Sequence, residues 1–453
     1  MNNPKSAPPI KPFIDTRWAD GLRGIASLFV VASHITLCFA RSVVPPATSR
    51  DGPSRPFQRP YLRLIGQGNA AVAVFFVLLG FVNSLKTIQL SRSGRVSDGL
   101  LALSTASFRR TSRLVFPAAI VTIISWFCCQ IGLYGLSRKS DAYWLQATTP
   151  EPSASWFEAF KSLGWELIAT WVKADNKYDQ PQWALPHLFL GSLYIYMVLL
   201  ATANATPAFR LAAEVALWFW GWVARDSIIQ PNVYAGMILA ELSFLPPPKR
   251  SSNLVKVLPF CGVALGLYLC SYPDSFAEYA PWSRQLQQLG LNIFPKHAML
   301  GRVWPNLGAQ VLCFSVMYSP HMRQVLSTAW LKWLGGLSFS IYLLHGPLMR
   351  TVLAWVVFGP RSILESTPVT GETTVDSSGP IPQPGDLSIA LRIPVFLFIL
   401  LFVARTWNKR VEPYLATATI NLGKFSQSFA KDVPRFHDAK LVDREVLPSW
   451  TKD

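Results

Sequence analysis

Long and nearly uncharged apolar segments constrain this chain more than any other feature. Leu114–Cys129, Leu188–Ala203 and Pro394–Ala404 contain no charged residue. A helix needs roughly 20 mainly apolar residues to cross a bilayer. Of the 453 residues, 51% are hydrophobic and only 15% are charged, whereas a soluble protein carries about 25% charged residues. We therefore predict an all-α integral membrane protein.

The apolar segments predict a bundle of about ten transmembrane helices within residues 17–408. A polar N-terminus of residues 1–16 and a polar tail of residues 409–453 flank this region. In Trp156–Val172, aromatic and apolar residues alternate with charged ones, which is typical of a helix lying at the membrane interface. The ten expected spans are Arg17–Ala40, Asn69–Thr87, Leu114–Leu136, Trp183–Ala203, Leu211–Ile229, Val233–Leu245, Leu254–Tyr272, Leu307–Tyr318, Trp333–Phe358 and Leu387–Trp407.

The distribution of basic residues predicts how these helices are oriented. With the N-terminus in the cytosol, the larger share of the 42 Lys and Arg residues falls on the cytosolic side, as the positive-inside rule requires. We expect both termini in the cytosol and a multi-pass protein of the endoplasmic reticulum or another endomembrane. Anionic lipids or a cytosolic anionic substrate account for the net charge of +17. Nucleic acid is therefore not an expected partner, and the cysteine spacings match no metal site.

The first expected span carries three ionisable residues, Asp20, Arg23 and His34. Asp20 and Arg23 are three residues apart and share a helix face. Eleven residues, at about 100° and 1.5 Å each, bring His34 back to nearly the same face about 16 Å deeper. An ionisable side chain at that depth is costly unless it faces a polar cavity. His34 is therefore either a functional group or a structural histidine bonded to a neighbouring helix.

Two further groups of polar residues occur beside or within expected spans. Arg110 and Arg113, at the start of the third span, share a face and suit phosphate oxygens. A basic anchor at the membrane edge is the alternative interpretation of this pair.

His345 follows Tyr342 in the ninth span and precedes Gly346 and Pro347. A proline there loosens the helix, and a helix–helix hydrogen bond is the structural alternative for His345.

Several of these motifs, in this order, resemble the membrane-bound acyltransferase-3 family. The segment Asp20–Ala26 followed by His34 is similar to the family's opening helix, with an Arg, ten residues and a His. Arg110–Arg113 matches its Arg-x-x-Arg motif. Three more segments are similar to its second, fourth and late helices: Phe75–Phe81, Gln182–Leu193 with Trp183, and Leu337–Gly346. The resemblance extends from about residue 15 to residue 410.

One position departs from the family pattern. Many relatives have a Glu after the Trp-x-x-Pro segment, where this chain has Leu188 beside His187. Either His187 replaces that carboxylate, or the carboxylate is dispensable in this chain. The departure bears on acceptor handling and on catalytic rate.

The resemblance implies transfer of an acyl group, commonly acetyl, from acyl-CoA to a hydroxyl group. Acetyl-CoA would be a co-substrate, with no permanently bound cofactor. The Trp-rich spans are most similar to fungal members that modify small natural products such as terpenoids or polyketides. A carbohydrate or lipid acceptor is an alternative. The oligomeric state is not predicted.

The expected mechanism combines the resemblance with the position of each residue. Arg110 and Arg113 would hold the coenzyme phosphates, with Arg23 nearby, and His34 would be the general base. No Gly-x-Ser-x-Gly motif is present, so direct transfer is preferred to a serine acyl-enzyme. An acyl-His34 intermediate is the alternative. Among other classes, a transporter also suits ten spans with intramembrane charges, and a non-catalytic scaffold is a third interpretation.

Overall fold

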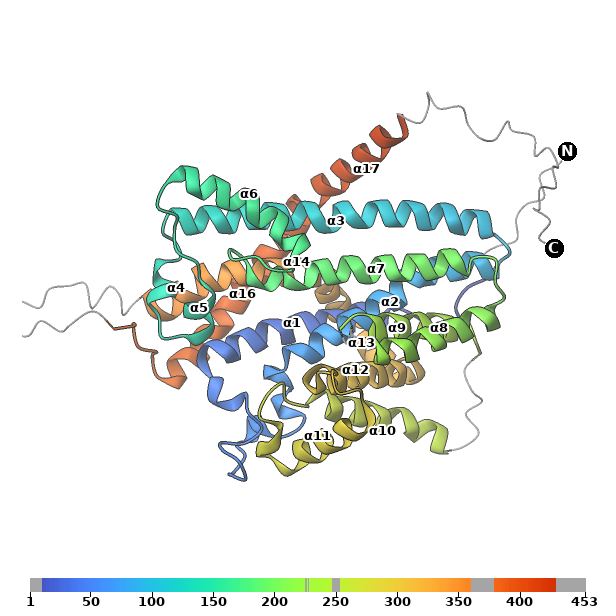
Figure 1. The fold of residues 1–453 in the computed structure, drawn as a ribbon, viewed down its shortest axis with the longest axis horizontal. Helices are drawn as coiled ribbons and strands as arrows, with labels where there is room; N and C mark the ends of the chain where they lie inside the picture. Colours follow the sequence, from blue (N-terminus) through green and yellow to red (C-terminus); the bar gives the residue numbers. More distant parts are fainter. Residues whose placement is uncertain (1–9, 225, 227, 247–252, 360–378, 429–453) are drawn as a thin grey trace, which may run out of the picture.

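The computed structural model describes residues 10–224, 226, 228–246, 253–359 and 379–428. These residues form an elongated helical bundle in which most long helices follow the long axis (Figure 1). The helices that match the ten expected spans are α1 (Trp18–Phe39), α2 (Gly68–Arg92), α3 (Val96–Gln130), α7 (Ala184–Ala201), α8 (Pro207–Val223), α9 (Gln230–Ser243), α10 (Asn253–Cys270), α12 (Leu300–Tyr318), α14 (Ala329–Leu348) and α16 (Asp386–Arg410).

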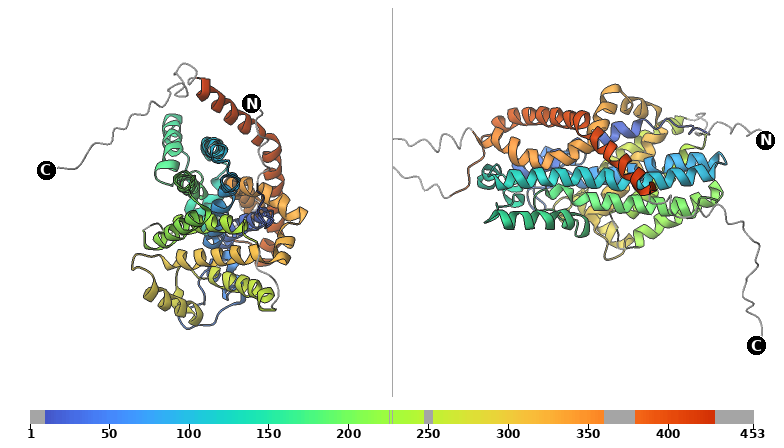
Figure 2. Two further views of the ribbon diagram at one scale, coloured as in Figure 1. Left: turned by 90° about the vertical axis from the view of Figure 1, so that its right-hand side faces the viewer. Right: turned by 90° about the horizontal axis from the view of Figure 1, so that it is seen from above.

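Shorter elements connect and cap this bundle. The helix expected over Trp156–Val172 is present as α6, with the same bounds, and its location at the membrane interface stays a prediction. The other helices are α4 (Gly135–Lys139), α5 (Tyr143–Thr148), α11 (Pro281–Ile293), α13 (Pro320–Leu326) and α17 (Glu412–Ser428), with 3-10 turns at Arg41–Val43, Pro56–Gln58, Leu62–Gly66, Gln180–Trp183 and Ala277–Tyr279. α17 lies within the segment predicted as a polar tail and projects beside α3 (Figure 2).

Among the residues that the structure describes, six helical segments are long and apolar enough to cross a membrane. They are Trp18–Phe39, Gly68–Arg92, Val96–Gln130, Gln180–Ala201, Ala329–Gly359 and Asp386–Phe425. The other expected spans are helices too, but α9, for example, has only 14 residues. An all-α membrane protein is therefore supported, while the number of ten spans stays a prediction.

Small residues bring α1 and α14 into close contact. A Cβ atom on Gly24 would lie 2.7 Å from the amide nitrogen of Gly335, and one on Gly335 would overlap the carbonyl oxygen of Asp20. Small residues allow such close backbone approach between membrane helices. The rings of His34 and His345 also meet, so α1 and α14 run parallel.

α16 returns antiparallel to α14. Its Asn408 donates to the carbonyl oxygen of Gly336, near the start of α14, at 2.8 Å. Its Arg392 donates to the carbonyl oxygen of Val357, beyond the end of α14, also at 2.8 Å. The start of α1, the start of α14 and the end of α16 therefore lie at one end of the bundle, which we call the arginine end because Arg23, Arg110 and Arg113 lie there.

A buried ionic cluster holds three helices together. Glu241 of α9 accepts from Arg92 of α2 at 2.5 Å and also from Arg210 of α8. Arg210 donates to Ser91 at 3.0 Å as well. All three charged side chains are largely removed from solvent, and a buried charge is tolerated only when it is paired and hydrogen-bonded. The cluster therefore fixes α2, α8 and α9 relative to one another.

Candidate active site

A cavity of about 440 Å³ opens among α1, α2, α3, α7 and α14 at the arginine end. Three arginines line it, Arg23, Arg110 and Arg113, together with two carboxylates, Asp20 and Glu412. The remaining wall is mainly apolar and includes Phe75, Leu79, Leu114, Leu188 and Phe339. An apolar cleft with a few convergent polar groups is the usual form of a small-molecule site.

Backbone and side-chain contacts hold two of the arginines in the wall. Arg23 donates to the carbonyl oxygen of Gly335 at 3.0 Å and to Asp20 at 3.2 Å. Arg110 donates through Nε to the hydroxyl of Ser192 on α7 at 3.0 Å. These contacts leave most of each guanidinium fork available, and such forks bind phosphate oxygens bidentately. The geometry brings the predicted Arg-x-x-Arg pair together with Arg23.

A histidine pair lies deeper in the bundle than the arginines. The ring centroids of His34 and His345 are 5.2 Å apart. As the eleven-residue spacing predicts, Arg23 and His34 face the same neighbour, α14. His345 is fully buried, whereas His34 is partly accessible. Trp144 of α5 packs against His34 with a centroid distance of 4.7 Å.

Tyr342 stands between the cavity and the histidine pair. It lines the cavity, and its ring centroid is 5.9 Å from that of His345. Its hydroxyl donates to the carbonyl oxygen of Pro181. His34 and His345 are not among the described residues that line the cavity, and the Tyr342 ring lies in the wall between the cavity and the pair.

A buried ion pair supports the histidines from the far side. Arg350 and Asp179 are both almost completely buried, with a distance of 3.6 Å between guanidinium and carboxylate. Asp179 precedes the apolar segment that begins at Gln180. Burial raises the pKa of Asp179 to about 7, and the positive charge of Arg350 acts in the opposite direction. A Cβ atom on Gly346 would overlap the Asp179 carboxylate, so this carboxylate lies directly beside the residue that follows His345.

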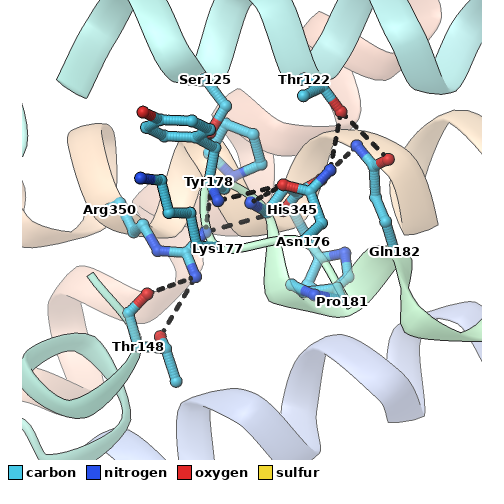
Figure 3. Close-up of polar contacts among 12 residues, drawn as sticks. Thr122, Ser125, Thr148, Asn176, Lys177, Tyr178, Pro181, Gln182, His345 and Arg350 are labelled. Atoms are coloured by element: carbon cyan, nitrogen blue, oxygen red, sulfur yellow. Dashed lines mark hydrogen bonds and ion pairs between the residues drawn. The ribbon is translucent and has the colours of Figure 1, made fainter. Parts of the chain in front are cut away.

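A network of hydrogen bonds fixes this ion pair (Figure 3). Arg350 donates to the carbonyl oxygens of Thr148 and Tyr178 at 3.0 and 3.2 Å. Gln182 donates to Asp179 at 3.0 Å. Thr122 of α3 donates to Gln182 and accepts from Asn176. α3, α5, the 176–182 segment and the π-helical turn Met349–Leu353 that follows α14 are thus connected.

Two residues singled out from the sequence lie away from the cavity wall. His187 bonds through Nδ1 to the carbonyl oxygen of Trp183, one helical turn back, at 2.9 Å. Trp183 in turn packs under the guanidinium of Arg302 at 5.2 Å. Among the described residues that line the cavity, Leu188 is present and neither Trp183 nor His187 is. The geometry therefore gives no support to His187 as a replacement for the missing carboxylate.

Four residues of the site were not predicted from the sequence: Arg350, Asp179, Ser192 and Glu412. Arg350 carried the clearest signal, because it is an arginine inside the ninth expected span and such residues mark functional or paired sites. Asp179 and Glu412 lie outside the expected spans. Ser192 is a small polar residue of the fourth span, and only its contact with Arg110 gives it a role.

The fold and the site define a helical membrane protein with an arginine-lined cavity next to a buried histidine pair. A family model described as an acyltransferase domain matches residues 16–411. The chain therefore belongs to the acyltransferase-3 family.

Curated proteins from fungi are similar to this chain over most of its length. The O-acetyltransferase PaAT-1 of Phomopsis amygdali is 27% identical over 376 residues, covering 74% of this chain and 73% of its own. The acyltransferase clz18 of Cochliobolus lunatus is 26% identical over 416 residues, covering 79% of this chain and 86% of its own. No solved structure matches the chain.

Proposed function

We propose that this chain is a membrane-bound O-acyltransferase that moves an acyl group, in the first instance acetyl, from acyl-CoA to a hydroxyl group of a small molecule. The observation that carries the proposal is the adjacency of an arginine-lined cavity and a buried histidine pair within one family-defined domain. The name of the relative PaAT-1, an O-acetyltransferase, supports acetyl as the group transferred. A terpenoid or polyketide alcohol is the proposed acceptor class.

The donor enters from the arginine end. Coenzyme A carries several phosphate charges, and the three arginines of the cavity exceed its two carboxylates in number. Arg110 and Arg113 hold the phosphates, and Arg23 on α1 lines the same cavity. A rise of about 16 Å separates Arg23 from His34, and the pantetheine arm spans this distance in an extended form. The thioester then passes Tyr342 to reach His34.

His34 acts as the general base. Its imidazole takes the proton of the acceptor hydroxyl while the oxygen attacks the thioester carbonyl carbon. The new C–O bond forms as the C–S bond breaks, and the proton on His34 passes to the sulfur, which leaves as the free thiol of coenzyme A. The base returns to its neutral form, so atoms and charge balance over one turnover.

The test uses the purified full-length protein, acetyl-CoA and the terpenoid alcohol geraniol as a surrogate acceptor, with thiol release and geranyl acetate both measured. His34→Ala should lower the rate about 100-fold or more, the usual contribution of a general base. His321→Ala is the matched control, because His321 is an exposed residue of α13. It should leave the rate unchanged.

Two outcomes contradict the proposal in different ways. If wild-type protein releases no thiol from acetyl-CoA, with geraniol or with water as acceptor, acetyl-CoA is not the donor. If folded His34→Ala protein turns over at a near-normal rate, acetyl-CoA remains the donor, but His34 is not the general base.

A further inference from the structure

The nitrogen atoms of the histidine pair differ in their hydrogen bonding. Nδ1 of His345 lies 2.5 Å from the carbonyl oxygen of Tyr342. A carbonyl oxygen can only accept, so Nδ1 of His345 carries a hydrogen. In a neutral imidazole the other nitrogen is then an acceptor. Nε2 of His345 is buried and has no hydrogen-bond partner among the described residues.

The facing histidine has a complementary free nitrogen. Nδ1 of His34 is also buried, and no described residue bonds to it. Two imidazoles joined by an N–H···N bond of about 3 Å have ring centroids about 5 Å apart, and the observed separation is 5.2 Å. The rings are inclined by 32°, and turning them so that these two nitrogens face each other at this separation forms the bond. Since an unbonded buried polar atom is costly, the bond satisfies both nitrogens at once.

We propose that His345 is a positioning residue for His34: its Nε2 accepts a hydrogen bond from Nδ1–H of His34 and thereby leaves Nε2 of His34 as the base for the acceptor hydroxyl. This inference rests on the proposed function. His34 is the partly accessible member of the pair, which suits the ring that meets the substrate. His345 also stabilises the imidazolium that forms on His34, as the third group of a catalytic triad does for its histidine.

The neighbours of the pair favour this arrangement. Trp144 packs on the His34 ring, and the guanidinium of Arg350 lies 5.1 Å from the centre of Trp144. These stacked groups limit the tilt of the His34 ring. On α14, the bond to Tyr342 limits the rotation of the His345 ring. Trp144 and the carbonyl oxygen of Tyr342 therefore each contact one ring of the pair.

Three substitutions at residue 345 separate this role from simple packing. A glutamine places its amide oxygen near the position of Nε2, whereas an asparagine places its amide near the position of Nδ1. His345→Gln should therefore retain activity within about 10-fold, because it keeps an acceptor for His34. His345→Asn keeps only the contact with Tyr342 and should fall about 100-fold, like His345→Ala. The KM for acetyl-CoA should change less than about 2-fold in all three.

The measurement is the rate of thiol release from acetyl-CoA with geraniol, together with that of a double variant. His34→Ala combined with His345→Ala should be no slower than His34→Ala alone, because the two residues act as a unit. Independent losses that multiply in the double variant overturn the inference. So does His345→Asn at the wild-type rate, or His345→Gln as slow as His345→Ala in folded protein.

These outcomes are distinct from failure of the proposed function. If His34→Ala is slow while the variants at residue 345 are fully active, only the positioning role of His345 is contradicted. Full activity of His34→Ala removes the base itself, and with it the proposed function of the pair.

Discussion

Arg109, Arg110 and Arg113 are neighbours in sequence whose side chains face different surroundings. Arg110 and Arg113 line the cavity, whereas Arg109 lies outside its lining, although Arg109 and Arg113 are both exposed. Replacing Arg113 by Ala should raise the KM for acetyl-CoA about 10- to 100-fold, because a hydrogen bond to a charged group contributes about 1.5–3 kcal/mol. Steady-state kinetics at saturating acceptor measures this change.

Arg109→Ala is the matched control and should change the same KM by less than about 2-fold. Equal effects of the two substitutions would mean that the basic cluster acts only as a membrane anchor. A change confined to the acceptor KM would move the donor site elsewhere.

At the residue scale, periodicity was enough to place Arg23 and His34 on one helix face. It was also enough to pair Arg110 with Arg113. It could not find Ser192, because a serine in an apolar helix has no signal until its partner is known. The relation of His345 to His34 was equally hidden, since 311 positions separate them in the sequence and only the packing of α1 on α14 brings them together.

The pairing of α1 with α14 depends on glycine at the contact. A methyl group on Gly335 would overlap the carbonyl oxygen of Asp20, whereas one on Gly336 would meet nothing within 4 Å. Gly335→Ala should destabilise the protein by about 1–3 kcal/mol, the usual cost of overpacking. Gly336→Ala should be neutral or slightly stabilising, because alanine favours a helix over glycine by about 1 kcal/mol. Thermal unfolding in detergent compares the two.

If both variants unfold at the wild-type temperature, the close contact between α1 and α14 does not limit stability. Activity adds a second measurement for Gly335→Ala, because separating α1 from α14 also separates His34 from His345. Its rate should fall even at temperatures where the protein remains folded.

Helices were more predictable than their exact ends and irregularities. The expected span at Leu114 proved to be the second half of α3, which begins at Val96. Apolar content predicts only the part of a helix that lies inside the membrane. The polar turns at the start of α3 lack this apolar content, so they were not predicted as part of the helix. The proline after His345 correctly indicated an irregular helix, and a π-helical turn at Met349–Leu353 follows it. That this turn directs Arg350 inward, toward Tyr178 and Thr148, could not be read from the sequence.

Over the whole molecule, hydropathy alone could not decide how many helices cross the membrane. In the described part of the chain, six segments meet the requirement on length and apolar content, and helices such as α8 and α9 are shorter or carry buried charges. Two of these charges, Arg210 of α8 and Glu241 of α9, are compensated within the bundle by the Arg92–Glu241–Arg210 cluster. Such compensation depends on tertiary contacts, so the sequence could only suggest it.

The arrangement of the helices allows the predicted orientation to be tested. The start of α1 and the end of α16 lie at the same end of the bundle as the three cavity arginines. Acyl-CoA is a cytosolic metabolite, and positive residues favour the cytosolic side. Epitope tags at residues 1 and 453 should therefore both be digested by protease added to sealed microsomes, while a luminal marker stays protected.

Protection of both tags would place the arginine cavity in the lumen and contradict the proposed route of the donor. Protection of one tag alone would require an odd number of spans and contradict the common end that the contacts among α1, α14 and α16 define.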